Sequence, residues 1–254
     1  MAGERAVVTG STSGIGRAIA VAFAREGAAV VVSGRDHTRG DAVVAEIAHS
    51  GGSASFVPAD LHDEAACGAL FDDAAAQLDG PPTVLVNNAA GGDARDARVA
   101  DTDTAAWDAI LRVDLTAAMW CARAAIRYMR AAGHGAIVNI SSRQGERPSA
   151  GLAAYVTAKA GLNGLTRAIA VEEAANNIRC NTISPGYVLN ERRDADIPPE
   201  RRARFAGMHL TRLGVATDVA AAAVYLASRE SEYLTGINLQ LDGGSSIARA
   251  LTLG

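Results

Sequence analysis

The chain has 254 residues, of which 49% are hydrophobic and 20% charged, and its formal net charge is −4 at pH 7. This length suits one large α/β domain spanning residues 1–254, with ample apolar side chains for a core. The acidic balance, and the lack of a basic block interleaved with aromatic residues, argue against a nucleic-acid partner.

The N-terminus, the cysteines and the histidines indicate a reduced, soluble protein without a metal. MAGER runs directly into the apolar AVVTG, which leaves no room for a signal peptide. No run of about 18 apolar residues suggests a membrane span. The 3 cysteines form no CxxC pair and the 5 histidines are scattered. We therefore expect reduced thiols, no metal site, no membrane partner and a cytoplasmic location.

The first predicted unit is a strand, a glycine-rich turn and a helix, formed by residues 6–9, GSTSGIG and RAIAVAFAREG. Gly10 permits a tight turn, Gly14 lets the backbone approach a pyrophosphate, and Gly16 allows close helix packing. The alternative is an ordinary strand–helix turn, but the apolar stripe of the helix favours packing on a sheet. The predicted cofactor-binding residues of this loop are Gly10, Thr12, Ser13, Gly14, Ile15 and Gly16.

The second predicted strand, residues 29–33, ends in Gly34 and Arg35. An acidic residue at this place binds the ribose diol of adenosine in dinucleotide-binding folds. An arginine suits a 2′-phosphate better, so we expect NADP(H) to be preferred and NAD(H) to be possible. A solvated loop arginine is the alternative, and the neighbouring Asp36 could draw the charge of Arg35 away.

Two further strands are predicted over residues 56–60 and 84–86. The first ends at Asp60, which together with Leu61 could bracket an adenine ring. The second runs into NNAAGG, where Asn87 and Asn88 stand beside small residues at the C-terminal end of the strand. Ligands bind at such edges of open α/β sheets, so this end of the strand is a predicted binding position.

Residues 105–129 show a long helical pattern with one carboxylate, Asp114, in its apolar middle. A buried acid needs a partner, because an isolated charge is costly to remove from water. We therefore expect Asp114 either to be satisfied by backbone N–H groups or to be functional.

The stretch from Ser141 to Lys159 carries the strongest chemical signal. Residues 136–140 predict a buried strand that brings Ser142 to its C-terminal edge, and the spacing of Tyr155 and Lys159 puts both on one helix face. Lys159 is the only lysine in the chain, so its compact ammonium group has a role that the arginines do not fill. A phenol that exchanges protons near neutral pH needs a lowered pKa, and a neighbouring ammonium is one way to lower it. For an isolated YxxxK, a packed tyrosine and a solvated lysine would be the better interpretation.

The last third of the chain predicts a strand over 178–184, a helix over 219–227 and a strand over 237–241. Between the strand 178–184 and the helix 219–227, residues 190–212 are polar and rich in arginine. We interpret this segment as a lid over the site rather than a solvated helix pair. The alternation of strands and helices predicts an α/β fold, a Rossmann-like doubly wound parallel sheet of about seven strands with helices on both faces.

These segments resemble the short-chain dehydrogenase/reductase family over essentially the whole chain. The resemblance rests on TGSTSGIG, Asp60, NNAA, Ser142, YVTAK, SPG and LDGG in this order. It implies that Tyr155 is the general acid/base, that Ser142 polarises the substrate carbonyl, and that Lys159 favours the phenolate and holds the nicotinamide ribose. The further cofactor residues that it implies are Asp60 and Leu61 at the adenine, Asn88 near the nicotinamide ribose, and Pro185, Gly186 and Val188 at the nicotinamide.

The chain departs from the family pattern at three positions. Asp114 stands where the family commonly has an asparagine that holds a water in a proton relay to the lysine. Asn190 stands where a threonine commonly contacts the carboxamide, and Ala90 replaces the glycine of NNAG. We include Asp114 among the candidate catalytic residues.

The predicted function is hydride transfer between NADP(H) and a small ketone or secondary alcohol. One alternative is a 3-oxoacyl-[acyl-carrier-protein] reductase, and another is a non-catalytic NADP(H)-binding regulator on the same scaffold. A stripe of small residues also predicts a homo-oligomer, by family resemblance a tetramer, because glycines within a helix usually permit close packing. The stripe consists of Thr157, Gly161, Gly164 and Ala168.

Overall fold

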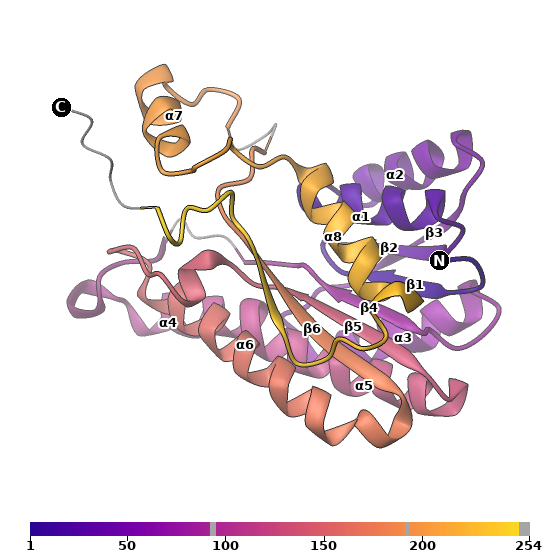
Figure 1. Cartoon of the computed structure of the whole chain (residues 1–254). Coiled ribbons are helices and arrows are strands. Elements are labelled where there is room, and N and C mark those ends of the chain that lie inside the picture. Colours follow the sequence, from indigo (N-terminus) through magenta and orange to yellow (C-terminus); the bar gives the residue numbers. More distant parts are fainter. Residues whose placement is uncertain (92–94, 191–193, 249–254) are drawn as a thin grey trace.

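The computed structural model describes residues 1–91, 95–190 and 194–248, and within them a single seven-stranded sheet forms the centre (Figure 1). Every strand pair is parallel, and the order is β3-β2-β1-β4-β5-β6-β7. The strands are β1 (Arg5–Val8), β2 (Ala29–Gly34), β3 (Ser53–Pro58), β4 (Val84–Asn87), β5 (Gly135–Ile140), β6 (Ile178–Pro185) and β7 (Asn238–Leu241).

Helices cover both faces of the sheet, as the Rossmann-like prediction requires (Figure 1). One face packs against α1 (Gly14–Arg25), α2 (His37–His49) and α8 (Ala216–Ala227). The other packs against α3 (Glu64–Gln77), α5 (Ala117–Ala132) and α6 (Ala153–Glu172). The remaining helices are α4 (Thr104–Leu111) and α7 (Pro199–Ala206), and α7 stands apart from the sheet in the lobe that was interpreted as a lid.

The central strands are apolar because they are buried on both faces. In β1, Val8 faces the α1 side and Val7 faces the α3 side, and both are fully buried. Phe23 of α1 and Phe71 of α3 fill the two cores. Strands of a parallel sheet that is covered by helices on both faces have nearly continuous hydrophobic sequences. This explains why these strands were recognisable from the sequence.

Two of the differences from the sequence-based element boundaries bear on the site. Strand β3 begins at Ser53 and ends at Pro58, so Asp60 follows the strand instead of ending it. Its first residues pair with β2 although they are small or polar, and periodicity could not detect them. The helical pattern of 105–129 is a composite, in which α4 and α5 flank a π-helical turn at Arg112–Thr116. That turn contains Asp114.

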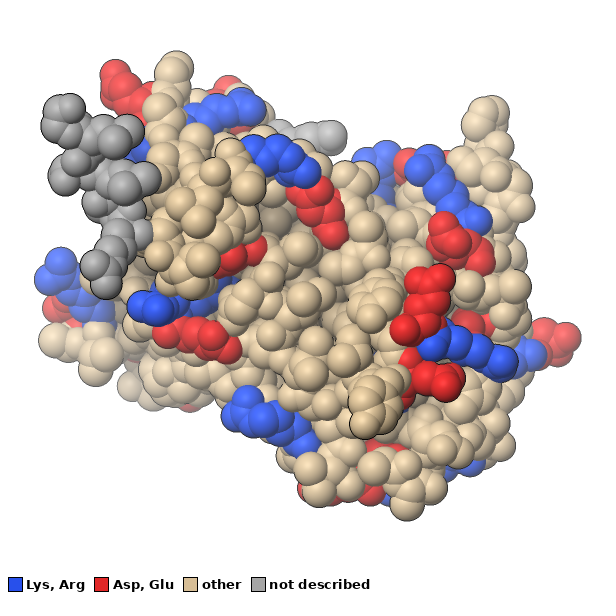
Figure 2. All heavy atoms as spheres, in the orientation of Figure 1, with Lys and Arg blue, Asp and Glu red and all other residues tan. Residues whose placement is uncertain are grey.

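The three cysteines are free thiols and all are buried. Burial raises the pKa of the Cys180 thiol to about 12, so it is a packing residue and not a nucleophile. In the described part of the chain, no helix combines the length and apolarity that a bilayer crossing requires. Basic and acidic side chains are interspersed on the face seen in Figure 2, without a continuous basic stripe.

The small residues of α6 differ in what surrounds them. A Cβ added at Gly161 would lie 2.8 Å from Cδ2 of Leu115, so this glycine lets the π-helical turn approach α6 within the same chain. Nothing lies within 4 Å of a Cβ added at Gly164. The open part of the stripe continues to Val171, whose relative exposure is 80%.

We predict that this exposed face of α6 mediates the homo-oligomer. Val171→Glu should reduce the molar mass measured by light scattering at micromolar concentration, because it buries a charge in the contact. Val99→Glu is the matched control, since Val99 is 83% exposed but lies outside α6. A monomeric unmodified protein, or equal effects of both substitutions, would contradict the prediction.

Candidate active site

Two cavities lie at the C-terminal edge of the sheet and share residues Asn88 and Ala90. The larger cavity has a volume of about 670 Å³ and is lined by Ser142, Tyr155 and Lys159, among others. The smaller, of about 250 Å³, is lined by the glycine-rich loop and the ends of β2 and β3. The sheet order reverses between β1 and β4, and such a crevice is where open α/β folds bind ligands.

The glycine-rich loop is built for close backbone approach. Gly10 and Gly14 have φ values of 62° and 56°, which favour glycine. A Cβ at Gly16 would lie 2.5 Å from the Gly10 carbonyl oxygen, so only glycine fits there. Helix α1 begins directly after Ser13, whose side chain makes no capping hydrogen bond. The first N–H groups of α1 are thus available to an anion, and the loop fits the pyrophosphate of a dinucleotide.

Asn88 holds the loop in this shape. Its Nδ2 donates to the carbonyl oxygens of Thr9 (3.0 Å) and Gly10 (3.1 Å), and its backbone N–H donates to Thr9 Oγ1 (3.0 Å). The side chain thereby joins the end of β4 to the end of β1. It lines both cavities, and its position near the nicotinamide ribose stays a prediction.

The smaller cavity contains the residues predicted for the adenosine end of the cofactor. Arg35, Asp60 and Leu61 all line it. Asp36 caps α2 by accepting from the backbone N–H of Arg39 and pairs with Arg39 Nε at 3.0 Å, so its charge is engaged away from Arg35. A hydrogen bond from the His62 side chain lowers the pKa of Asp60, which keeps this carboxyl ionised.

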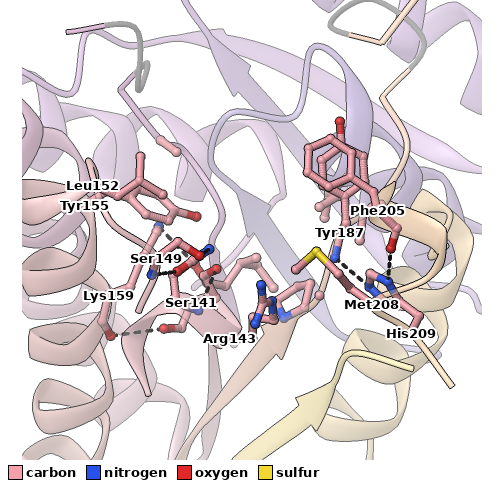
Figure 3. Close-up of a pocket in the computed structure, with 18 of the residues that line it drawn as sticks. Ser141, Arg143, Ser149, Leu152, Tyr155, Lys159, Tyr187, Phe205, Met208 and His209 are labelled. Carbon is pink, nitrogen blue, oxygen red and sulfur yellow. Dashed lines mark hydrogen bonds between the residues drawn. The ribbon is translucent and has the colours of Figure 1, made fainter. Parts of the chain in front are cut away.

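The chemical groups converge on the larger cavity (Figure 3). Tyr155 and Lys159 lie on one side of it, and the Lys159 Nζ is 5.5 Å from the centroid of the Tyr155 ring. The same ammonium donates to the Ile140 carbonyl oxygen at 3.2 Å. Ser142 is buried at the end of β5, and its Oγ accepts a hydrogen bond from Gln144 N at 3.2 Å. The structure thus brings the three predicted catalytic side chains to one cavity.

Asp114 lies behind Lys159 with only 2% of its surface exposed. Its Oδ2 is 3.6 Å from Lys159 Nζ, and its Oδ1 accepts a hydrogen bond from the Gly91 N–H at 2.6 Å. Of the two roles that the sequence left open, the structure shows the backbone N–H partner, and it also places the carboxylate next to Lys159. π-Helical turns occur frequently at functional sites, and this one directs the carboxylate towards the lysine.

The opposite wall of the larger cavity comes from the end of β6 and the lobe. Pro185, Gly186 and Val188 line it, as does His209, whose Nε2 accepts from Tyr187 N at 3.2 Å. The rings of Tyr187 and Phe205 stack with centroids 4.2 Å apart. Figure 3 shows Tyr187, Phe205 and His209 facing the side that carries Tyr155. The lobe lines the cavity, although residues 191–193 of the predicted lid lie outside the described residues.

Sequence reasoning did not single out two groups at this site. Asp96 accepts hydrogen bonds from Ala154 N (3.1 Å) and Tyr155 N (2.9 Å), although it is distant from both in the chain. Arg143, Arg201 and Arg204 line the larger cavity, and none of them pairs with an acid in the part of the chain that the structure describes. No local pattern marks Asp96, whereas Arg201 and Arg204 lie in the segment that was interpreted as a lid, without a role of their own.

The comparisons with known proteins agree with this fold. Residues 10–246 match the family model described as Enoyl-(Acyl carrier protein) reductase. The chain is similar to the cis-4-hydroxycyclohexanecarboxylate dehydrogenase of Sinomonas cyclohexanicum, with 41% identity over 94% of this chain and 95% of the relative. It is also similar to the 2,5-dichloro-2,5-cyclohexadiene-1,4-diol dehydrogenase of Sphingobium indicum, with 36% identity over 97% and 98% of the two chains.

A solved structure resembles the whole chain. It comes from Beutenbergia cavernae and is described as an NAD(P)-dependent gluconate 5-dehydrogenase with NADP bound at low occupancy. The two proteins are 37% identical, superimpose with a TM-score of 0.89, and each covers 98% of the other.

The Asp114–Lys159 pair predicts a change in pH dependence. Asp114→Asn keeps an oxygen that can accept from Gly91 but removes the negative charge next to the ammonium. Without that negative charge the ammonium acts more strongly on the Tyr155 oxygen, so the pH at which alcohol oxidation reaches half its maximum should fall. Asp108→Asn on the exposed face of α4 is the control with the same charge change. An unchanged profile would mean that Asp114 acts only by holding Gly91.

Proposed function

Because this chain belongs to the short-chain dehydrogenase/reductase family and is an NAD(P)-dependent oxidoreductase of that family, we propose that it transfers a hydride between NADP(H) and a cyclic secondary alcohol or its ketone. The observation that carries the proposal is that Tyr155, Lys159 and Ser142 line one cavity, which shares Asn88 with the cavity of the glycine-rich loop. The dehydrogenase names of the relatives speak against the regulator alternative.

The proposed steps assign one task to each side chain. The bound nicotinamide supplies or accepts the hydride. Ser142 donates a hydrogen bond to the substrate oxygen and fixes its position, and Tyr155 gives that oxygen a proton in reduction and takes it back in oxidation. Lys159 stabilises the phenolate between turnovers, and Asp114 and the Ile140 carbonyl hold the ammonium in place.

Arg35 supports the proposed preference for NADP(H). It lines the smaller cavity close to Thr12 and Gly34, and Asp36 does not neutralise it because that carboxylate pairs with Arg39. A guanidinium–phosphate contact is charge-assisted and contributes about 1.5–3 kcal/mol. Substitution of Gly34 by aspartate is a poor test, since a Cβ there would lie 2.8 Å from Thr12 Cγ2 and would displace the loop.

Replacing Arg35 tests the cofactor preference cleanly. Arg35→Gln should reduce kcat/KM for NADPH by roughly 10- to 150-fold, because the charge-assisted contact to the 2′-phosphate is lost. The value for NADH should change less than about threefold. Arg17→Gln, which removes an α1 guanidinium paired with Glu46, is the control. A similar decrease of kcat/KM with NADPH and NADH in Arg35→Gln would refute the proposal. A preference of the unmodified protein for NADH would refute it as well.

The larger cavity supports a substrate that carries a carboxylate. Three arginines line it, and no acid stands among its described lining residues. Arg201 and Arg204 lie over the ring of Phe205, with guanidinium carbons 5.5 Å and 5.7 Å from its centroid. Aromatic and apolar groups thus accompany the positive charges, which suits an apolar ring with an anionic substituent. By its name, the Sinomonas relative acts on a hydroxylated ring carboxylate.

A substrate panel with NADP⁺ tests this proposal. cis-4-Hydroxycyclohexanecarboxylate should be oxidised with a kcat/KM at least about tenfold above that of cyclohexanol, and Arg143→Gln should remove most of the difference. Arg147→Gln, in the same loop but outside the cavity, is the matched control.

Replacing Tyr155 tests the acid/base step. Tyr155→Phe should lower kcat at least about 100-fold while NADPH still binds. Equal activity on both alcohols would exclude carboxylate recognition, and full activity of Tyr155→Phe would exclude the mechanism.

The 3-oxoacyl carrier-protein alternative draws on the same positive charges, because an acidic carrier could meet Arg201 and Arg204, which are exposed on α7. The same panel separates the two substrates. A β-ketoacyl thioester reduced at least about tenfold more efficiently than a cyclic ketone would favour the carrier-protein activity.

A further inference from the structure

The start of α6 is held by two residues of the loop that follows β4. Ala153 N donates to the Ala97 carbonyl oxygen at 3.2 Å. Ala154 N and Tyr155 N donate to Asp96 Oδ1 and Oδ2 at 3.1 Å and 2.9 Å. The residue at the N-cap position, Leu152, makes no capping bond with its side chain. Residues 96 and 97, which are distant in the sequence, thus accept the hydrogen bonds that a local N-cap side chain normally accepts.

This arrangement gives the first three N–H groups of α6, at residues 153–155, their hydrogen-bond partners. The first intrahelical bond of α6 runs from Val156 N to the Leu152 carbonyl oxygen, so the N–H groups of the three residues before Val156 have no partner within the helix, and all three donate to residues 96 and 97. Asp96 Oδ1 also accepts from the N–H of Ala97 at 2.8 Å, which fixes the carboxylate itself. A carboxylate at this end also interacts favourably with the helix dipole.

Tyr155 itself donates its backbone N–H to Asp96. The loop that carries Asp96 begins at Asn88, next to the glycine-rich loop. Asn88 and Ala90 line both cavities, and Gly91 donates to Asp114. We propose that Asp96 is a positioning residue, which sets the place of Tyr155 relative to the bound cofactor and substrate by fixing the first turn of α6 to this loop. The inference rests on the proposed role of Tyr155 as the acid/base.

A purely structural cap is the competing explanation, and the chain contains a matched example. Asp103 caps α4 by accepting from Ala106 N at 2.9 Å, and α4 carries none of the residues that line the larger cavity. Loss of either cap should lower thermal stability to a similar degree. Only the loss of the Asp96 cap should affect turnover, because small displacements of a reacting group are costly to the rate.

The experiment compares Asp96→Ala, Asp96→Asn and Asp103→Ala in the full chain with saturating NADP(H). Asp96→Ala should lower kcat roughly 10- to 100-fold, with the Kd for NADPH and the substrate KM within about threefold of their original values. Asp96→Asn retains one acceptor oxygen and should restore kcat to within about fivefold of the unmodified protein. Amide hydrogen exchange at residues 153–155 should accelerate in Asp96→Ala and remain slow in Asp103→Ala.

The outcomes separate the possible failures. A kcat for Asp96→Ala within twofold of that of Asp103→Ala, at a similar thermal midpoint, would reduce Asp96 to a stabilising cap and overturn the inference. The inference would also be overturned if Asp96→Ala lowered kcat, Asp96→Asn did not restore it, and NADPH binding weakened as well. If Asp96→Ala does not fold, the rate and exchange measurements on Asp96→Asn decide. Activity that survives Tyr155→Phe would instead invalidate the proposed function, whatever Asp96 does.

Discussion

The buried ion pair between Lys159 and Asp114 constrains the architecture of the site more than any other contact. Both side chains are almost fully buried, at 3% and 2% exposure, and removing two charges from water costs several kcal/mol per ion. Their mutual attraction, the Ile140 carbonyl and the Gly91 N–H offset this cost. Helix α6, the π-helical turn, β5 and the loop after β4 therefore depend on one another, because displacing any of them would leave a buried charge without its partner.

That dependence explains how distant segments form one site. The glycine-rich loop follows β1, Asn88 follows β4, Ser142 follows β5, and these strands are neighbours at the reversal of the sheet order. Asn88 links the first two through its bonds to Thr9 and Gly10. The parallel sheet alone brings the loops to one edge, and the polar contacts then fix them at the distances that hydride and proton transfer need.

The sheet and most of the site were predictable because their signals are local. Buried strands are apolar runs, and a YxxxK pair on a helix or a glycine at positive φ follows from spacing within a few residues. The π-helical turn around Asp114 was not predictable, because its sequence continues the helical pattern on both sides. Asp96 was not recognised either, since its partners lie about sixty residues further on and no pattern relates them. Gly161 was interpreted as an oligomer contact, whereas its neighbour is Leu115 of the same chain.

The two walls of the larger cavity differ in how firmly they are held. Tyr155 is fixed by a capped helix and stands beside a buried lysine, so a substitution that shifts it must break several hydrogen bonds. Helix α7 buries none of its residues, and the aromatic stack of Tyr187 and Phe205 and the hydrogen bonds of His209 join it to the end of β6. Segments with few buried contacts change conformation at low free-energy cost. The substrate recognition that we propose for Arg201 and Arg204 can therefore vary while the residues around Tyr155 stay in place.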